Sequence, residues 1–214
     1  MKKILTGDGS FTFLNEEFKE VYHSISGAEE EAVKKYAAPT NIFELAKKGR
    51  IRILDICFGM GYNSSAAIDI ALNSNPECRI DIIGLEKDKS LLNSLKDLKP
   101  KFKNYDIIRN IKNDFYKDSN VDLRILFGDA VETIKKVEGL FDVCFLDPFS
   151  PRKLPSLWTQ NFFKDISSKL KTGGVLATFS CATHVRINLV RAGFDVKDGP
   201  CIGRRAPSTI AVKL

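Results

Sequence analysis

From residue 51 onward, short apolar runs alternate with longer segments whose apolar residues recur at helical spacing. The apolar runs predict strands over 51–56, 80–85, 123–127, 141–146 and 175–179. The segments between them predict helices over 62–72, 158–170 and 183–191, and another that Asp88 caps. Residues 104–122 predict a helix and a loop. Strands that alternate with helices form a mostly parallel sheet with helices on both faces, so we expect an α/β, Rossmann-like fold.

Both ends of the chain depart from this alternation. The last apolar runs, 194–197 and 209–213, predict a C-terminal antiparallel hairpin strand, which completes a seven-stranded sheet. Near the N-terminus the pattern predicts a glycine-rich turn and a short strand over 10–13, followed by two short helices. We therefore expect residues 1–50 to form a small N-terminal extension and residues 51–214 to form the main domain.

Acidic side chains stand at the ends of the predicted parallel strands. Asp55 lies near the end of the first strand, and Glu86, Asp129 and Asp147 follow the next three. The carboxyl ends of parallel strands meet at one edge of a sheet, where such folds bind their ligands. The first strand also runs into Gly59-Met60-Gly61, a turn that lets the backbone approach a ligand closely. The glycines alone would also suit a tight turn without a ligand, but the four carboxylates together predict a binding site.

These carboxylates suit methyl transfer from an adenosine-containing donor. Glu86 can accept both ribose hydroxyl hydrogens, and Asp129, within Gly128-Asp129-Ala130, suits an adenine amino group. Asp147-Pro148-Phe149-Ser150 resembles the Asp/Asn-Pro-Pro-Tyr/Phe signature of methyltransferases that act on amines. Asp147 would accept an amine N–H and take up the proton, and Phe149 would stack on a flat base. The alternative is structural, with Glu86 a solvated strand-end carboxylate and Asp147 a strand-end cap.

Composition bears on the partner and the compartment. There are 33 Lys and Arg residues against 27 Asp and Glu, and the net charge of +6 fits either a polyanion such as RNA or a lysine-rich surface. None of the five cysteines stands in a C-x-x-C pair, which predicts no metal site and a reducing, cytoplasmic compartment. The N-terminus does not resemble a signal peptide, and no apolar run reaches the ~20 residues of a membrane span, so we expect no membrane partner.

The chain also carries a series of specific motifs in a fixed order. The N-terminal ones are Gly7-Asp8-Gly9-Ser10-Phe11-Thr12 and Tyr22-His23-Ser24-Ile25-Ser26-Gly27-Ala28. The central ones are Ile53-Leu54-Asp55-Ile56-Cys57-Phe58-Gly59-Met60-Gly61-Tyr62-Asn63, Phe145-Leu146-Asp147-Pro148-Phe149-Ser150-Pro151 and Leu157-Trp158-Thr159-Gln160. The last are Thr172-Gly173-Gly174-Val175-Leu176-Ala177-Thr178-Phe179 and Gly203-Arg204-Arg205. From about Leu5 to the C-terminus, the chain resembles the methyltransferase half of the MnmC family.

The resemblance implies a function and a set of site residues. It implies S-adenosylmethionine-dependent N-methylation of the 5-aminomethyl group of the wobble uridine in tRNA, which gives 5-methylaminomethyl-(2-thio)uridine. It further implies a stand-alone form, without the flavin-dependent oxidase domain of bifunctional members, whose N-terminal extension covers the active site. Asp147 would be catalytic. The expected cofactor-binding residues are Asp55, Gly59, Gly61, Asn63, Glu86, Lys87, Asp129 and Ala130. The expected substrate-binding residues are Asp8, Ser10, Tyr22, His23, Phe149, Trp158, Arg204 and Arg205.

Two other functions stay open. Pro148 departs from the small residue usual in the MnmC family, which stiffens the loop and removes one N–H. An aminopropyltransferase of the spermidine synthase type shares the Asp-Pro after the fourth strand, but the basic loops argue against a polyamine substrate. A non-catalytic RNA-binding module on a methyltransferase fold is opposed by the glycine turn and the carboxylates at the strand ends. The favoured interpretation is a monomer that has tRNA as its partner.

Overall fold

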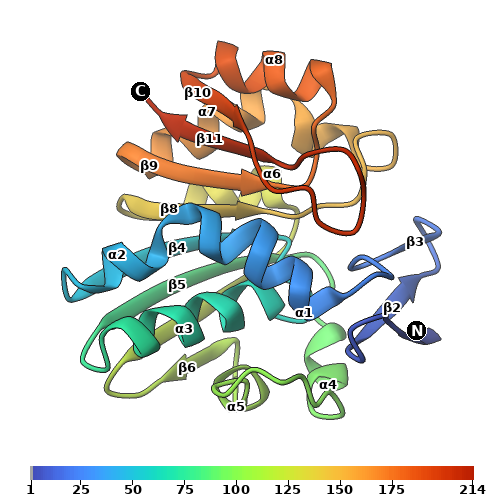
Figure 1. Ribbon diagram of the computed structural model, residues 1–214, viewed down its shortest axis with the longest axis vertical. Helices are drawn as coiled ribbons and strands as arrows, with labels where there is room; N and C mark the ends of the chain where they lie inside the picture. The colour runs from blue at the N-terminus through green and yellow to red at the C-terminus, as the bar shows by residue number, and fades with distance from the viewer. Residues whose placement is uncertain (1) are drawn as a thin grey trace.

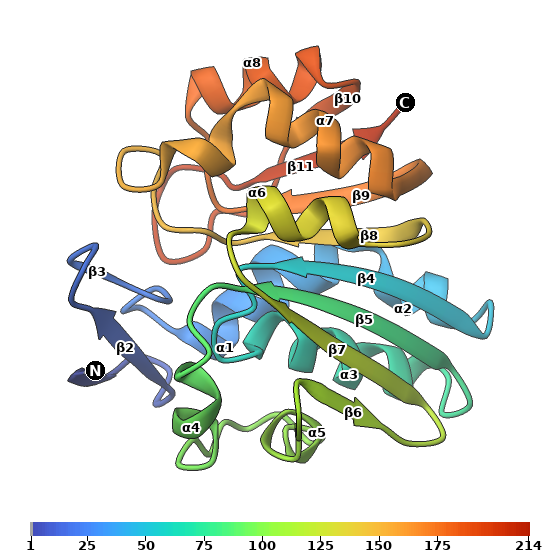
Figure 2. The same ribbon diagram turned by 180° about the vertical axis from the view of Figure 1, so that it is seen from behind.

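The computed structural model describes residues 2–214, whose main feature is a twisted eight-stranded sheet (Figures 1 and 2). Its strands are β4 (Arg50–Ile56), β5 (Arg79–Glu86), β6 (Phe115–Lys117), β7 (Val121–Phe127), β8 (Phe141–Leu146), β9 (Leu170–Thr178), β10 (Phe194–Asp198) and β11 (Thr209–Lys213). Their order across the sheet is β10-β11-β9-β8-β4-β5-β7-β6. The strands from β9 to β7 pair in parallel, whereas β11 and β6 run antiparallel to their neighbours. The expected mostly parallel Rossmann-like sheet is confirmed.

Helices cover both faces of this sheet. One face carries α1 (Ala28–Glu31), a π-helix (Ala32–Ala37), α2 (Ile42–Ala46) and α3 (Tyr62–Ser74) (Figure 1). The opposite face carries α6 (Ala130–Thr133), α7 (Gln160–Lys169) and α8 (Thr183–Arg191) (Figure 2). The short helices α4 (Leu91–Leu95) and α5 (Asp106–Arg109) lie between β5 and β6 along the chain. Short 3-10 turns occur at Ala38–Thr40, Ile134–Lys136 and Pro155–Trp158.

The alternation of side chains along the strands produces two apolar clusters. Ile53 belongs to the cluster beneath α1, α2 and α3, and its neighbour Leu54 belongs to the cluster beneath α6, α7 and α8. Both residues are fully buried, because successive side chains of a strand point to opposite faces. This explains why the first parallel strand is apolar almost throughout.

The N-terminal segment forms a second, three-stranded antiparallel sheet. Its strands are β1 (Lys2–Leu5), β2 (Phe11–Asn15) and β3 (Glu20–Val21). This sheet lies at the carboxyl-end edge of the main sheet, near α1 (Figure 1). Phe13 of β2 and Tyr36 of the π-helix share an apolar cluster with Ile53 of β4.

Three local predictions differ from the structure. The sheet has eight strands rather than seven, because the chain turns back over residues 118–120, where the Asp118 N–H donates to the Val121 carbonyl, so that β6 pairs with β7. The predicted helix over 158–170 begins at Gln160, where the Thr159 side chain caps it, and it ends at Lys169. Leu170, the last residue of the predicted helix, is instead the first residue of β9. Asp88 does not cap α4, because its carboxylate accepts bonds from the backbone and hydroxyl of Ser90.

The topology places a switch point beside β4. β4 pairs with β5 on one side and with β8 on the other. The strands that follow β4 in the chain are therefore added first on the β5 side and later on the β8 side. Ligands of such folds bind at the carboxyl ends of the strands next to this point. Within residues 2–214, no helix is long and apolar enough to cross a membrane.

Candidate active site

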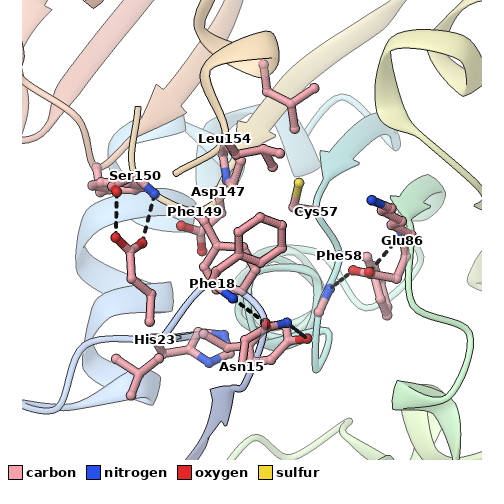
Figure 3. A pocket seen from close by; sticks show the side chains of 18 of the residues that line it. Asn15, Phe18, His23, Cys57, Phe58, Glu86, Asp147, Phe149, Ser150 and Leu154 are labelled. Atoms are coloured by element: carbon pink, nitrogen blue, oxygen red, sulfur yellow. Dashed lines mark hydrogen bonds between the residues drawn. The ribbon is translucent and has the colours of Figure 1, made fainter. Parts of the chain in front are cut away.

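A cavity of about 830 Å³ lies at the carboxyl ends of β4, β5, β7 and β8, where residues of the N-terminal sheet help to line it (Figure 3). A volume of this size is typical of a cofactor or ligand site. Many of the residues predicted from the sequence line it, namely Tyr22, His23, Gly59, Asn63, Glu86, Lys87, Asp129, Ala130, Asp147, Phe149 and Arg204. The strand-end carboxylates other than Asp55 therefore meet around one space.

The turn after β4 brings the backbone N–H of Gly59 to the Glu86 carboxylate at the cavity wall. Gly59 has a φ of 56°, and its N–H donates to Glu86 Oε2 at 2.8 Å. Gly61 has a φ of 69°, and a Cβ at this position would lie 2.8 Å from the side chains of Ile108 and Phe58. Gly61 lies outside the cavity lining, so its packing and backbone conformation, rather than a ligand contact, account for the second glycine.

Glu86 is held firmly at the end of β5. Its side chain accepts hydrogen bonds from the backbone N–H groups of Gly59, Lys87 and Asp88, at 2.7 to 2.8 Å. Burial raises the pKa of Glu86, although these three bonds oppose the shift. A carboxylate has about four lone-pair positions, so this one keeps an acceptor position for a ligand hydroxyl. Asp129 caps α6 by accepting from the Val131 N–H at 2.9 Å through Oδ1.

Asp147 lies across the cavity from Glu86 in the view of Figure 3. Its Oδ1 accepts a hydrogen bond from the hydroxyl of Tyr36, and its Oδ2 accepts from Asn63 Nδ2 at 3.0 Å. Burial and the nearby Glu31 carboxylate raise the pKa of Asp147 to about 7, while the two hydrogen bonds and Lys35 lower it. This carboxylate can therefore hold or release a proton near neutral pH.

The π-helix contributes cavity residues that sequence reasoning missed. Lys35 forms an ion pair with Glu31, and both side chains are less than 10% exposed and line the cavity. Glu31 also accepts from the N–H of Ser24 at 2.7 Å. The neighbouring Tyr36 donates to Asp147. Single π-turns are often found at functional sites, but a segment rich in Glu and Lys has the pattern of a solvated helix, so the sequence carries no signal for it.

An aromatic cluster, formed by Phe18, Tyr22 and Phe149, lines the same cavity as Asp147. The Phe18 and Phe149 rings stack at 4.7 Å, and Tyr22 meets Phe149 edge-on at 5.2 Å. Glu20 of β3 accepts from the Ser150 N–H at 3.0 Å and from its hydroxyl at 2.5 Å. These contacts join the N-terminal sheet to the loop after β8 (Figure 3). Neither Phe18 nor Glu20 belongs to a motif that would have singled it out.

Two predicted substrate residues, Asp8 and Ser10, lie outside the cavity lining and hold the N-terminal sheet to α1. Asp8 accepts from Ser10 and from the N–H of Glu30 at 3.0 Å, and Ser10 accepts from the N–H of Ala28 at 3.2 Å. Burial alone would raise the pKa of Asp8, but the hydrogen bonds it accepts outweigh this effect and lower it. A Cβ on Gly27 would lie 2.7 Å from the Asp8 carboxylate, so this motif forms a tight structural joint.

Asp55 and Trp158 also lie outside the cavity lining. Asp55 is fully buried, and its Oδ2 accepts from the Ser64 hydroxyl at 2.6 Å. Burial raises its pKa to about 8, so it is largely protonated at neutral pH. Trp158 is buried under the loop after β8, where its Nε1 donates to the Phe149 carbonyl at 3.0 Å. Trp158 thus supports the position of Phe149 from outside the cavity.

The remaining predicted residues differ in their exposure. His23 stacks on Tyr62 at 4.8 Å, and burial lowers its pKa to about 4, so its ring is neutral near neutral pH. Arg204 lines the cavity, and its guanidinium donates to the carbonyls of Phe179 and Pro207. Arg205 lies outside the lining and is exposed.

Comparison with known proteins agrees with this arrangement. Residues 95–214 match a family model described as S-adenosyl-L-methionine-dependent methyltransferase. The chain is 33% identical to an uncharacterized protein of Methanocaldococcus jannaschii over 97% of this chain and 58% of that protein. It is 24% identical to the bifunctional protein MnmC of Leptospira interrogans, named for tRNA 5-methylaminomethyl-2-thiouridine biosynthesis, over 94% of this chain and 34% of that protein. The chain thus spans little more than half of the first relative and about a third of the second.

Solved structures extend the similarity to the whole fold. The crystal structure of MnmC2 from Aquifex aeolicus superimposes with a TM-score of 0.89 at 34% identity, over 99% of this chain and 70% of that one. The S-adenosylhomocysteine-bound methyltransferase PaMTH1 of Podospora anserina, at 18% identity and a TM-score of 0.50, shares the fold alone. The family match and the Aquifex structure together show that the chain belongs to the S-adenosylmethionine-dependent methyltransferases, as a methyltransferase domain of the MnmC type.

Proposed function

We propose that this methyltransferase transfers one methyl group to the primary amine of 5-aminomethyl-uridine at the wobble position of tRNA, giving 5-methylaminomethyl-(2-thio)uridine. The observation that carries the proposal is the environment of Asp147. Its carboxylate is held by Tyr36 and Asn63 in a cavity whose far side carries Glu86 and Asp129. The names of the MnmC relatives point to the same class of tRNA modification.

The residues on the Glu86 side fit S-adenosylmethionine. Glu86 would accept one ribose hydroxyl at its remaining acceptor position, next to the Gly59 N–H and Lys87. Asp129 accepts from the Val131 N–H with one oxygen, and its other oxygen would accept from the adenine amino group, beside Ala130. Asp55 and Gly61 would support this wall from behind, since neither reaches the cavity.

Asp147 performs the proton chemistry in this proposal. S-Adenosylmethionine supplies an electrophilic methyl group: as the amine lone pair forms the N–C bond, the C–S bonding pair stays on sulfur, and the nitrogen is left with one proton in excess. The ionised Asp147 accepts an N–H of the amine, orients its lone pair, and then takes up that proton. A pKa of about 7 lets the carboxyl accept the proton and return it to water within each turnover.

The N-terminal extension would act as the cover of the site. Residues 1–50 supply Phe18, Tyr22 and the Glu20 that holds Ser150, so they would exclude water from Asp147. Phe149 would stack on the uracil ring, and Arg204 and Arg205 would contact phosphates at the entrance. All five cysteines are free, which fits a reducing cytoplasmic compartment, and we propose that the enzyme acts there as a monomer.

The experiment that tests the proposal is incubation with methyl-labelled S-adenosylmethionine and tRNA that lacks the final methyl. We expect label in 5-methylaminomethyl-(2-thio)uridine after digestion to nucleosides. A parallel reaction with putrescine and decarboxylated S-adenosylmethionine tests the aminopropyltransferase alternative. If spermidine forms and no labelled nucleoside is found, the protein is an aminopropyltransferase and the proposal is wrong. If the protein binds tRNA but forms neither product, it is a non-catalytic RNA-binding module.

A further inference from the structure

Among residues 2–214, the side chain of Asn63 makes one of the roughly four hydrogen bonds available to an amide. It is 4% exposed and lines the cavity at the start of α3. Its Nδ2 donates to Asp147 Oδ2 at 3.0 Å, whereas its Oδ1 is buried and has no hydrogen-bond partner among residues 2–214. Leaving a buried acceptor unpaired is unfavourable, and Asn63 differs from the other buried residues with an unpaired atom, such as Asp55 and Thr178, in that it lines the cavity, where a ligand can supply a donor.

Asp147 fixes the orientation of this amide. An Asn63 oxygen turned toward the ionised carboxylate would place two acceptors against each other, so the nitrogen faces Asp147. The oxygen is therefore directed away from Asp147, at the other end of the same amide group. The second oxygen of Asp147 is held by Tyr36, so neither group can rotate without losing a hydrogen bond. Two neighbouring acceptors of fixed orientation result, one charged and one neutral.

We propose that Asp147 and Asn63 form a two-acceptor clamp that holds both hydrogens of a primary amine and limits transfer to one methyl group. This inference rests on the proposed function, and it assigns Asn63 to the amine rather than to the cofactor. A neutral primary amine has two N–H groups and one lone pair. With one hydrogen on Asp147 and the other on Asn63 Oδ1, the lone pair is left free and points in a defined direction.

The same clamp discriminates against the product. After methylation and loss of a proton, the secondary amine keeps one N–H and carries a methyl group in place of the other. If that N–H binds Asp147, the methyl group lies against Asn63 Oδ1, which is again buried without a donor. A site that hydrogen-bonds an N–H strongly rejects a ligand that lacks this N–H. Such a site discriminates better than an apolar pocket that separates ligands by size alone. A second transfer is therefore disfavoured at the step of amine binding.

The first measurement uses the wild-type protein. Its single-turnover rates are compared on tRNA bearing the aminomethyl group and on tRNA already bearing the methylaminomethyl group. We expect the second rate to be lower by at least ~100-fold, with no dimethylamino nucleoside detected by mass spectrometry. Comparable rates on the two tRNAs would overturn the clamp, whatever any variant does.

Two variants then test Asn63 itself. Asn63→Ala removes the acceptor and leaves space, and Asn63→Leu removes it with little change in volume. Both also remove the donor to Asp147, which affects the two tRNAs alike, so the ratio of the two rates isolates Oδ1. We expect this ratio to fall by at least ~10-fold in both variants, and S-adenosylhomocysteine affinity, measured by calorimetry, to stay within ~3-fold of wild type. Retained calorimetric binding also reports that the variants are folded.

Asp129→Asn is the matched control on the other side of the cavity. It should weaken S-adenosylhomocysteine binding and leave the ratio of the two rates unchanged. If the Asn63 variants behave in the same way, or lose both rates in equal proportion, Asn63 serves the cofactor or merely supports Asp147, and the clamp is wrong. Failure of the wild-type protein to methylate aminomethyl tRNA, with S-adenosylhomocysteine bound normally, would instead remove the proposed function on which the clamp rests.

Discussion

The two sides of the cavity are built by different means. On the Glu86 side, carboxylates at successive strand ends converge because the sheet topology brings those ends together. On the Asp147 side, the partners are 84 and 111 residues away along the chain, at Asn63 and Tyr36. The first side therefore follows from the repeating fold, whereas the second depends on contacts between residues that lie far apart along the chain.

The difference has a consequence for function. The Glu86 side uses strand-end carboxylates and backbone N–H groups, so it suits a cofactor shared by many enzymes. The Asp147 side draws on the π-helix, the N-terminal sheet and the loop after β8, and it can change without disturbing the cofactor wall. Variants on the two sides should therefore separate cofactor binding from amine chemistry.

Loss of the Asp147 carboxylate should have the largest effect. Asp147→Ala removes the group that accepts the amine proton, and we expect kcat to fall ~10³-fold, within the range typical of general-base loss. S-Adenosylhomocysteine affinity should stay within ~3-fold of wild type, because this group lies on the amine side. Single-turnover methyl transfer and calorimetry measure the two quantities. Unchanged turnover would remove Asp147 from the mechanism.

Glu86→Ala should show the opposite pattern. It removes the proposed ribose acceptor and leaves the N–H groups of Gly59, Lys87 and Asp88 without their acceptor, so we expect S-adenosylhomocysteine affinity to fall ~30-fold or more. The maximal rate at saturating S-adenosylmethionine should change much less. Glu86→Gln, which keeps one acceptor oxygen, is the matched control and should lose less affinity. Full affinity in Glu86→Ala would contradict a contact with the cofactor.

Tyr36→Phe should act through pH. The Tyr36 hydroxyl lowers the pKa of Asp147, which is about 7, so its removal should raise that pKa. Because the reaction needs ionised Asp147, the rate falls as pH drops through this pKa, and the acid limb of the kcat/KM profile should move to higher pH. We expect a loss of ~10-fold at pH 7 that shrinks as pH rises toward 9.

Tyr62→Phe provides the comparison for this pH profile. The Tyr62 hydroxyl donates to the Phe11 carbonyl at 3.0 Å, so the variant loses a hydrogen bond of similar kind without touching Asp147. Its acid limb should coincide with that of wild type. A parallel displacement in both tyrosine variants would mean that the profile reports general loosening of the fold rather than the ionisation of Asp147.

Glu20→Ala should have the smallest effect and should concern the cover. It removes both bonds to Ser150, and with partly exposed groups we expect about 1 kcal/mol, or a ~5-fold rise in KM for tRNA. S-Adenosylhomocysteine affinity should not change. Glu77→Gln, at an exposed position with no part in the cavity, is the control. A rise in cofactor Kd equal to the rise in KM would show that the cover serves both sides.

Much of the fold and of the Glu86 side was predictable from the sequence. Runs such as 141–146 coincide with observed strands, and the order of strands and helices leaves few alternatives for the sheet. Once the strands are placed, Glu86, Asp129 and Asp147 must lie at one edge. The short β6 was missed because its three residues are too few for an apolar pattern, and the positive φ angles of Asn113 and Asp114 create the turn before it.

The rest of the site could not be read from local pattern. Lys35 and Tyr36 lie in a segment whose charges resemble those of an exposed helix, and their burial depends on packing against β8 and β9. Conversely, Asp8, Ser10 and Trp158 belong to specific motifs but make structural contacts outside the cavity lining. A motif indicates that a residue type is needed at a position, and only the tertiary contacts show whether the need is structural.

In the π-helix over Ala32–Ala37, the irregular backbone conformation serves the proposed site better than a regular α-helix would. A π-turn holds one residue more than an α-turn and is intrinsically less favourable. Each residue of an α-helix advances by about 100° around the axis, whereas each residue of the wider π-turn advances by less. If the same residues were wound as an α-helix, Tyr36 would therefore be rotated relative to Glu31, and it could not meet Asp147 while Glu31 stays beside Ser24. A more regular helix of unchanged sequence would thus separate contacts on which the proposed site depends.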